Sequence, residues 1–318
     1  MSLRIVFMGT PAFAVPPLEA LASSEHDIVA VVSQPDRPSG RKMKVTPTPV
    51  HSAAERLGLP HHQPEKIRTE AYLEWLSGLH PDLYVTAAYG RILTPQILSI
   101  PKYGCLNIHA SLLPKHRGAS PVNASIIQGD TRTGITLMLT EEGMDTGDIL
   151  YQESIPIPED MDAGQLSDQL SLLGARRIVP VIDAWVSGTL HPVPQDHSLA
   201  TNTKPMNRTD GKIDWTLAAT DIHNLVRGTT PWPGAFTWMD GKRVKIHHSR
   251  VAHDLSNQTA VSGVRPGTVL DTCPACIRVA CGHDSVLEIL NLQAEACKRL
   301  DARECFHNFH PGAVFGEE

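Results

Sequence analysis

The chain has 318 residues, of which 41% are hydrophobic and 5% aromatic, and its formal net charge is −6 at pH 7. This length suits about two domains. The acidic balance excludes a positive field over the whole protein, so any contact with nucleic acid must come from local basic patches. No apolar run reaches the roughly 18 residues of a membrane span, and the chain starts directly in a strand-like segment without a signal peptide.

The first segments predict a βαβ unit. Residues 3–8 form a continuous apolar run, which is typical of a strand buried on both faces of a sheet. Residues 13–21 have helical apolar spacing, and residues 28–32 predict a second buried strand. A parallel sheet is therefore expected, with sites at the carboxyl ends of its strands. Only Gly9 stands where a G-x-G-x-x-G fingerprint would lie, which disfavours a nicotinamide cofactor and a hydride-transfer enzyme.

Residues 34–49 predict an exposed loop, because the segment is rich in Pro and Gly and poor in apolar residues. A loop of this length between α/β elements is uncommon and often functional, although a solvated surface excursion would have the same composition. The functional alternative is a basic finger that contacts phosphates. Its cations are Arg37, Arg41, Lys42 and Lys44.

The region from 104 to 150 carries the residues best suited to catalysis. Helices at 50–57 and 70–76 and a strand at 82–88 precede it. Asn107 and His109 lie two apart on an apolar run, so on a strand they point to the same face. An acidic turn containing Asp145 could close over them. An amide, an imidazole and a carboxylate suffice for acyl transfer to an amine without a covalent intermediate. Polar side chains that satisfy one another in the core are the alternative, which the spacing alone leaves open.

The second half of the chain predicts a long helix, a linker and short strands. Strands at 135–139 and 148–155 precede an amphipathic helix at 166–185. Residues 191–206 contain three prolines and little apolar periodicity, as in an inter-domain linker. Short strands follow at roughly 8–12-residue spacing, with an Asp-Gly hairpin turn at 240–241, and predict a small β-barrel. One of these strands carries Lys242, Arg243 and Lys245, which suit either a charge-protected edge or an RNA-binding face.

Cysteine usage indicates a reducing compartment. Six cysteines are few for this length, so reduced thiols are expected rather than a disulfide framework. Cys273 and Cys276 have metal-like spacing, but no second pair accompanies them. Plain thiols are therefore expected there, and no metal site is predicted.

An ordered set of motifs resembles the formyltransferase family that uses 10-formyltetrahydrofolate. The set comprises Asn107-x-His109, Ser111-Leu112-Leu113-Pro114, Arg117-Gly118 with Pro121, Thr133-Gly134-x-Thr136 and Asp145-Thr146-Gly147. The basic loop, the segment DGKIDW at 210–215 and the block RGTTPWPGAFT at 227–237 resemble the branch that acts on methionyl-tRNA, so the resemblance covers nearly the whole chain. The chain departs from the branch at residues 293–299, where relatives have a stretch rich in glycine and lysine.

The resemblance implies a fold, a reaction and partners. The expected architecture is α/β: a Rossmann-like formyltransferase domain at 1–189 with a parallel-rich sheet, a linker at 190–206 and an OB-like tRNA-binding β-barrel at 207–318. The expected reaction transfers the formyl group of 10-formyltetrahydrofolate to the α-amino group of initiator methionyl-tRNA, for translation initiation. The resemblance also implies a cytoplasmic monomer with no metal, no membrane contact and no obligate protein partner.

The resemblance assigns roles to particular residues. Asn107 and protonated His109 would stabilise an oxyanion, Asp145 would orient His109 and remove a proton, and Thr136 would position a water. Phe13 would touch the methionyl side chain, although a core aromatic in a first helical turn explains it equally well. Folate contacts are implied for Ser111, Leu112, Leu113, Pro114, Tyr89, Gly90 and Ile92, and tRNA contacts for Arg37, Arg41, Lys42, Lys44, Lys242, Arg243 and Lys245.

Two alternatives remain open. A sugar-nucleotide formyltransferase would have the same catalytic residues but would bind an amino-sugar nucleotide and ignore tRNA. The basic loop and the barrel-like half of the chain argue against it. A nonenzymatic RNA-binding protein on a degenerate enzyme scaffold is the other alternative, and the complete set of Asn107, His109 and Asp145 argues against that one.

Overall fold

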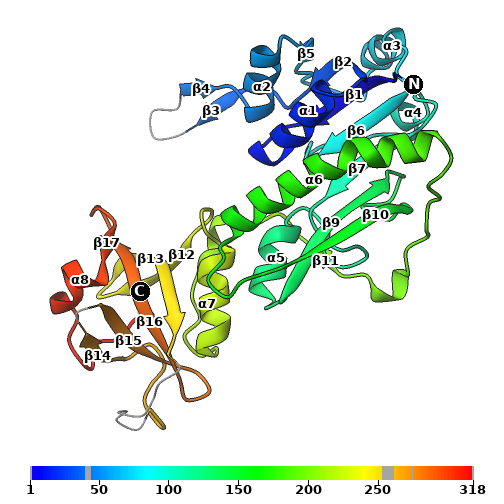
Figure 1. Cartoon of the computed structure of the whole chain (residues 1–318). Helices are drawn as coiled ribbons and strands as arrows, with labels where there is room; N and C mark the ends of the chain where they lie inside the picture. The colour runs from blue at the N-terminus through cyan, green and yellow to red at the C-terminus, as the bar shows by residue number, and fades with distance from the viewer. Residues whose placement is uncertain (1, 40–43, 253–260, 274, 317–318) are drawn as a thin grey trace. The chain divides into compact units, whose positions relative to one another are not determined.

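The computed structural model describes residues 2–39, 44–252, 261–273 and 275–316, which divide into two compact units (Figure 1). The first unit comprises Met1–Pro121, Thr133–Ile155 and Ser167–Lys204. The second comprises Val122–Arg132, Pro156–Leu166 and Pro205–Glu318. Within the described ranges, no helix has the length and apolar character needed to cross a membrane.

A seven-stranded sheet forms the centre of the first unit, in the order β10-β9-β7-β6-β1-β2-β5. The pairs β2–β5, β1–β2, β1–β6 and β6–β7 are parallel, and β7–β9 is antiparallel. The central strands are buried on both faces, which is why their sequences are continuous apolar runs. The predicted parallel-rich α/β sheet is confirmed. The strands are β1 (Arg4–Gly9), β2 (Asp27–Val32), β5 (His61–His62), β6 (Leu83–Ala87), β7 (Cys105–His109), β9 (Arg132–Leu139) and β10 (Ile149–Pro156).

Helix ends follow local signals in the sequence. α2 begins after Thr48, whose side chain accepts a hydrogen bond from the backbone N–H of His51, and it ends at Gly58 in the left-handed region. The helices before residue 190 are η1 (Ala12–Ala14), α1 (Val15–Ala22), α2 (Pro49–Leu57), α3 (Glu70–Gly78), α4 (Pro95–Leu98), α5 (Pro121–Ile127) and α6 (Ala163–Val186). Of these, α5 from Val122 onward and the first turn of α6 cluster with the second unit.

The segment predicted as an exposed loop contains a hairpin. β3 (Arg37–Ser39) pairs antiparallel with β4 (Lys44–Thr46). At its base, Asp36 Oδ1 accepts from Thr48 N at 3.0 Å and Asp36 Oδ2 lies 2.9 Å from His51 Nδ1. The expectation of a loop is thus wrong for these six strand residues, because cross-strand pairing depends on contacts that composition does not report. Arg41 and Lys42 lie outside the described residues, and Lys44 is described only as a strand residue.

The predicted linker lies partly against the first unit. Val193 forms an antiparallel bridge with Ile149, and β11 (Asn202–Thr203) pairs in parallel with β8 (Arg117–Gly118). A short 3-10 helix, η2 (His197–Leu199), lies between them. Residues up to Lys204 therefore cluster with the first unit.

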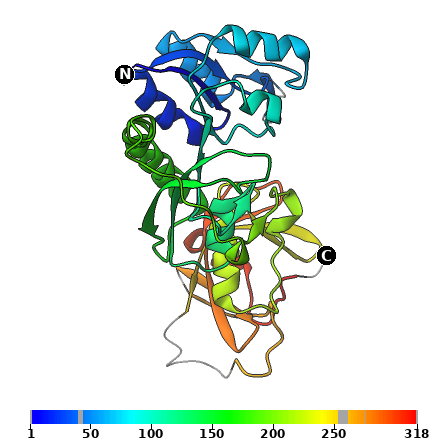
Figure 2. The same ribbon diagram turned by 90° about the vertical axis from the view of Figure 1, so that its right-hand side faces the viewer.

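The second unit contains a six-stranded sheet in the order β12-β13-β16-β15-β14, with β17 paired to β16. Its strands are coloured from yellow to red in Figure 2. Its strands pair antiparallel with one another, which confirms the predicted β-rich C-terminal domain. Asp240 and Gly241 both have positive φ, as a two-residue hairpin turn requires. Its elements are β12 (Ala235–Met239), β13 (Lys242–Val251), β14 (Val269–Cys273), β15 (Cys276–Cys281), β16 (Ser285–Ala294), β17 (Leu300–Asp301), η3 (Arg208–Gly211), α7 (Ala219–Gly228), α8 (Ala302–Cys305) and η4 (Phe306–Asn308).

The core of this unit joins α7 to the sheet. Ile222 and Val226 of α7 pack with Ile246, Ile277 and Leu287 of the strands. Burial of these aliphatic side chains supplies the hydrophobic stabilisation that a sheet with one covered face requires.

Cys276 is disulfide-bonded, so the expectation of reduced thiols is wrong at this position. The β14–β15 hairpin places Cys276 opposite Cys273 in the strand register, a closeness that depends on the fold of the turn. Cys105, Cys281, Cys297 and Cys305 are free. Among the residues for which a structure is given, no three His, Cys, Asp or Glu side chains are grouped so that they could hold a metal ion.

Candidate active site

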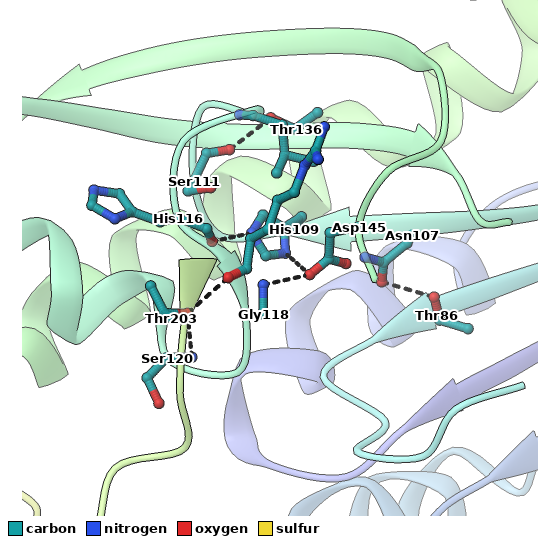
Figure 3. Close-up of polar contacts among 12 residues, drawn as sticks. Thr86, Asn107, His109, Ser111, His116, Gly118, Ser120, Thr136, Asp145 and Thr203 are labelled. Carbon is teal, nitrogen blue, oxygen red and sulfur yellow. Dashed lines mark hydrogen bonds and ion pairs between the residues drawn. The ribbon is translucent and has the colours of Figure 1, made fainter. Parts of the chain in front are cut away.

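Asn107, in the middle of β7, presents a side-chain amide that makes one hydrogen bond to a neighbouring strand (Figure 3). The register of β6 and β7 places Thr86 beside it, and Asn107 Oδ1 accepts a hydrogen bond from Thr86 Oγ1 at 2.8 Å. With the carbonyl oxygen engaged, the Nδ2 hydrogens have no partner among the described residues. The amide can therefore donate to a bound oxygen atom.

His109 lies on the same face of β7 and is 6% exposed. Its Nε2 donates to the backbone carbonyl of His116 at 2.9 Å, and its Nδ1 lies 3.6 Å from Asp145 Oδ2. A carbonyl and a carboxylate both accept hydrogen bonds. Nε2 is therefore a hydrogen-bond donor, and the carboxylate lies at ion-pair distance from Nδ1.

Asp145 reaches His109 from the turn between β9 and β10 (Figure 3). Its Oδ2 also accepts from Gly118 N at 2.7 Å. Gly118 has φ +106, and a Cβ at this position would lie 2.4 Å from the carbonyl oxygen of Thr203. Glycine is thus required where the backbone N–H points at the carboxylate. The structure brings Asn107, His109 and Asp145 into one group.

The hydroxyl of Thr136 makes hydrogen bonds to its protein neighbours. Its hydroxyl donates to Ser111 O at 2.6 Å and accepts from Leu113 N at 3.0 Å and Gln152 Nε2 at 2.9 Å. A hydroxyl has one donor and two acceptor positions, and all three are occupied. In this structure the side chain of Thr136 holds the loop after β7, and its role toward a water stays a prediction.

The loop predicted to contact folate is held by its own hydrogen bonds. Ser111 Oγ donates to Lys115 O at 2.6 Å, and Leu113 O accepts from Gln152 Nε2 at 2.8 Å. The side chains of Ser111 and Leu113 are buried. Only Leu112 and Pro114, which are half-buried, retain side-chain surface for a ligand.

A cavity of about 480 Å³ adjoins the turn after β6. Gly90 and Ile92, two of the residues with implied folate contacts, line it, whereas Tyr89 is 4% exposed and packs in the core with Tyr72. Burial raises the pKa of the Tyr89 phenol, in keeping with a neutral core side chain. The other lining residues are Glu65, Lys66, Ile67, Arg68 and Arg91.

Sequence reasoning missed the three cations of this cavity, Lys66, Arg68 and Arg91. They come from two segments more than 20 residues apart. Lys66 and Arg68 precede the helix predicted at 70–76 and Arg91 follows the strand predicted at 82–88, which is too common a placement for cations to identify a site.

The remaining predicted contacts lie on exposed or half-exposed positions. Arg37 and Lys242 are exposed. Arg243 lies with its guanidinium carbon 3.8 Å from the centre of the Phe236 ring, and Lys245 is on the same side of β13. Lys242 is on the other side, in alternation with Arg243. Phe13 is half-buried in η1.

Two family models match the chain in succession. The model described as formyl transferase matches residues 3–182, and the model described as formyl transferase, C-terminal domain, matches residues 205–310. The methionyl-tRNA formyltransferase of Acetivibrio thermocellus is 43% identical over 317 residues, which cover 99% of this chain and 100% of the relative. The methionyl-tRNA formyltransferase of Citrifermentans bemidjiense is 45% identical over 318 residues, covering 99% and 97%.

Solved structures share the fold at lower identity. The N-formyltransferase from Helicobacter canadensis, in complex with folinic acid and dTDP-3-aminofucose, is 16% identical with a TM-score of 0.64, and the match covers 90% of this chain and 98% of that chain. The two family models and the full-length relatives agree with the motif order and with the two-unit fold. The chain belongs to the formyl transferase family and, within it, to the methionyl-tRNA formyltransferases.

Proposed function

We propose that this chain transfers the formyl group of 10-formyltetrahydrofolate to the α-amino group of methionyl-tRNA. One observation carries the proposal: Asn107, His109 and Asp145 meet at the end of β7 in a chain that matches methionyl-tRNA formyltransferases over 99% of its length. The finer expectations, namely the initiator tRNA, a monomer and a cytoplasmic location, belong to the same proposal.

Asn107 is proposed as an oxyanion donor. When the amine attacks the formyl carbon, a C–N bond forms and negative charge develops on the formyl oxygen. The two Nδ2 hydrogens left over by the Thr86 contact can stabilise that charge. The carbonyl double bond re-forms, and the charge leaves the formyl oxygen, as the bond from the formyl carbon to N10 of the folate breaks. Loss of one such donor typically lowers the rate by about 10²–10³-fold.

His109 and Asp145 are proposed to act as a pair. His109 Nε2 can exchange the carbonyl of His116 for the formyl oxygen, while Nδ1 stays against the carboxylate of Asp145. Asp145 accepts the proton that the attacking amine loses, directly or through a water, and N10 gains a proton as it leaves. The 3.6 Å separation fits a site without substrate, because catalytic hydrogen bonds often tighten only in the reactive complex.

The cavity beside Gly90 suits the folate co-substrate. β6 and β7 are adjacent parallel strands, so their carboxyl ends lie about 4.8 Å apart on the same edge of the sheet. The cavity follows β6 and the reactive residues end β7. Its cations Lys66, Arg68 and Arg91 fit the carboxylates of the glutamate part of a folate, which would leave the formyl-bearing end toward Asn107.

The test measures formyl transfer from labelled 10-formyltetrahydrofolate by the purified chain. Initiator methionyl-tRNA, elongator methionyl-tRNA and a 4-amino-sugar nucleotide are offered as separate acceptors. Transfer confined to the initiator tRNA is the expected result. Equal transfer to both tRNAs would remove the initiator part of the proposal.

A sugar nucleotide acceptor is the second candidate, which the fold likeness to the Helicobacter canadensis enzyme favours. Transfer to the 4-amino-sugar nucleotide would support it and overturn the proposed acceptor. Absence of transfer to all three acceptors would overturn the proposed reaction.

A further inference from the structure

Gln195, in the segment that the sequence predicts as a linker, is only 6% exposed. Its Nε2 donates to the backbone carbonyls of Asp145, at 2.9 Å, and Gly147, at 2.7 Å. Its Oε1 accepts from both Nε and Nη2 of Arg117, at 3.1 and 2.6 Å. A side-chain amide has two donors and two acceptor positions. Arg117 and the turn at 145–147 therefore occupy every hydrogen-bonding position of Gln195.

The turn that Gln195 contacts needs external support. Asp145 has φ +53, a left-handed conformation that costs energy for a residue with a Cβ. Gly147 passes so close to β9 that a Cβ there would lie 1.9 Å from the carbonyl oxygen of Leu139. Two donors from one buried amide fix the carbonyls on either side of Thr146, and thus hold the turn in this conformation.

Arg117 sets the orientation of the amide. It is 6% exposed, and because its guanidinium only donates, it selects the orientation of Gln195 in which Oε1 faces Arg117 and Nε2 faces the turn. The next residue, Gly118, donates its backbone N–H to the Asp145 carboxylate. Asp145 is thus held at two points: its carbonyl by Gln195 and its carboxylate by Gly118.

We propose that Gln195 is a positioning residue for the formyl transfer. It holds the backbone of the turn so that the Asp145 carboxylate faces His109 Nδ1. It has no role in the binding of either substrate. The inference rests on the proposed function. A merely structural Gln195 would stabilise the segment at 193–203 without a specific effect on the catalytic step.

Two substitutions test the inference in the full chain. Gln195→Glu keeps the size and the partner Arg117 but turns a carboxylate toward the two carbonyls. Gln195→Leu removes all four hydrogen bonds. Each is expected to lower kcat by roughly 10–100-fold, because a displacement of about 1 Å in a catalytic group can cost about 10²-fold. KM for 10-formyltetrahydrofolate and for methionyl-tRNA is expected to change less than about twofold.

Asp82→Ala is the matched control. It removes a carboxylate that accepts from the backbone N–H of Arg4 at 2.8 Å, in the same unit but at the amino ends of the strands. It is expected to lower the melting temperature, although by less than Gln195→Leu, which removes four hydrogen bonds, while kcat stays at the wild-type value. Circular dichroism and thermal melting establish that each variant is folded; if Gln195→Leu does not fold, Gln195→Glu carries the test.

A double-mutant cycle with Asp145→Asn decides between positioning and structure. If Gln195 acts through Asp145, the second substitution lowers kcat by less than about twofold when Asp145 is already altered. A full additional loss would overturn the inference, as would a wild-type kcat in both Gln195 variants or a change confined to KM. If the wild-type chain transfers no formyl group, the proposed function fails; if it does and the variants match it, only the positioning role fails.

Discussion

The two regions expected to meet the substrates are built in opposite ways. At the end of β7, Asn107, His109 and Asp145 are each held by a hydrogen bond to a neighbouring group. On the hairpin and on β13, the exposed Arg37 and Lys242 have no polar partner among the described residues. The contrast follows from what each region must do. Charge that develops in a transition state is stabilised by dipoles already in place, whereas Lys and Arg side chains that neutralise phosphates act mainly through their charge and depend less on a fixed geometry.

Asn107→Ala tests the hydrogen-bonded group at the end of β7 most directly. The substitution is expected to lower kcat by about 10²–10³-fold, because it removes an oxyanion donor. His109→Ala is expected to lower kcat by a similar factor. Affinity for methionyl-tRNA, measured by fluorescence titration, should stay near the wild-type value. Turnover close to wild type in either folded variant would show that the preformed group at β7 is not the catalytic one.

Asp145→Asn asks whether the carboxylate acts through its charge. The amide keeps the size and can still accept from Gly118 N, but it loses the charge that faces His109. A loss of roughly 10²-fold in kcat is expected, at the lower end of general acid–base effects. Glu142→Gln, an exposed substitution in the same turn, is the control and should leave single-turnover rates unchanged. Equal losses in both variants would point to the net charge of the turn instead.

Arg37→Ala and Lys242→Ala test the exposed region. Each is expected to raise KM for methionyl-tRNA a few-fold with kcat unchanged, and to reduce the slope of log K against log salt by about 1. Lys102→Ala removes an exposed cation at the amino ends of the strands and serves as the control. If all three variants have the same salt dependence, neither Arg37 nor Lys242 contacts the tRNA.

Polar side chains fixed by hydrogen bonds also occur away from the candidate active site, at the base of the β3–β4 hairpin. Burial, with a further contribution from the charge of His51, lowers the pKa of His61 from its ordinary 6.5 to about 4. Between pH 4 and pH 6.5 the folded state therefore binds fewer protons than the unfolded state. Stability contributed by the neutral ring is thus fully present above pH 6.5 and is lost as the pH falls toward 4.

Urea unfolding from pH 7 to pH 4 measures this effect, which should be the smallest of the four. His61→Gln can keep a hydrogen bond to Ser33 and should flatten the pH dependence. His80→Gln, at an exposed position, should not. Identical pH dependence in the wild type and in His61→Gln would contradict the assignment.

Much of the fold was predictable because its signals are local. Apolar runs identified β1, β2, β6 and β7, and the Asp-Gly pair identified the β12–β13 turn. The spacing of Asn107 and His109 placed both side chains on one face of a strand, as the structure has them. Each of these inferences depends on neighbours within a few residues, where backbone geometry decides which side chains can meet.

Contacts between distant segments were not predictable in this way. Asp145 follows His109 by 36 positions, and its closure over the ring was implied by the family resemblance alone. The role of Thr136 was likewise implied by the resemblance, and its three hydrogen-bond partners, which come from two other segments, could not be read from the sequence. The disulfide at Cys276 and the hairpin at 37–46 escaped notice for the same reason.

The sequence by itself determined the order of strands and helices, the pair of side chains on β7 and, through its motifs, the family. The tertiary structure alone decided that Gln195 lies buried against the turn of Asp145 and that Lys66, Arg68 and Arg91 share one cavity. The physical reason is the range of the interactions. Periodicity reports which face of an element is buried, but hydrogen bonds between segments form only once the packed core has fixed the distance between them.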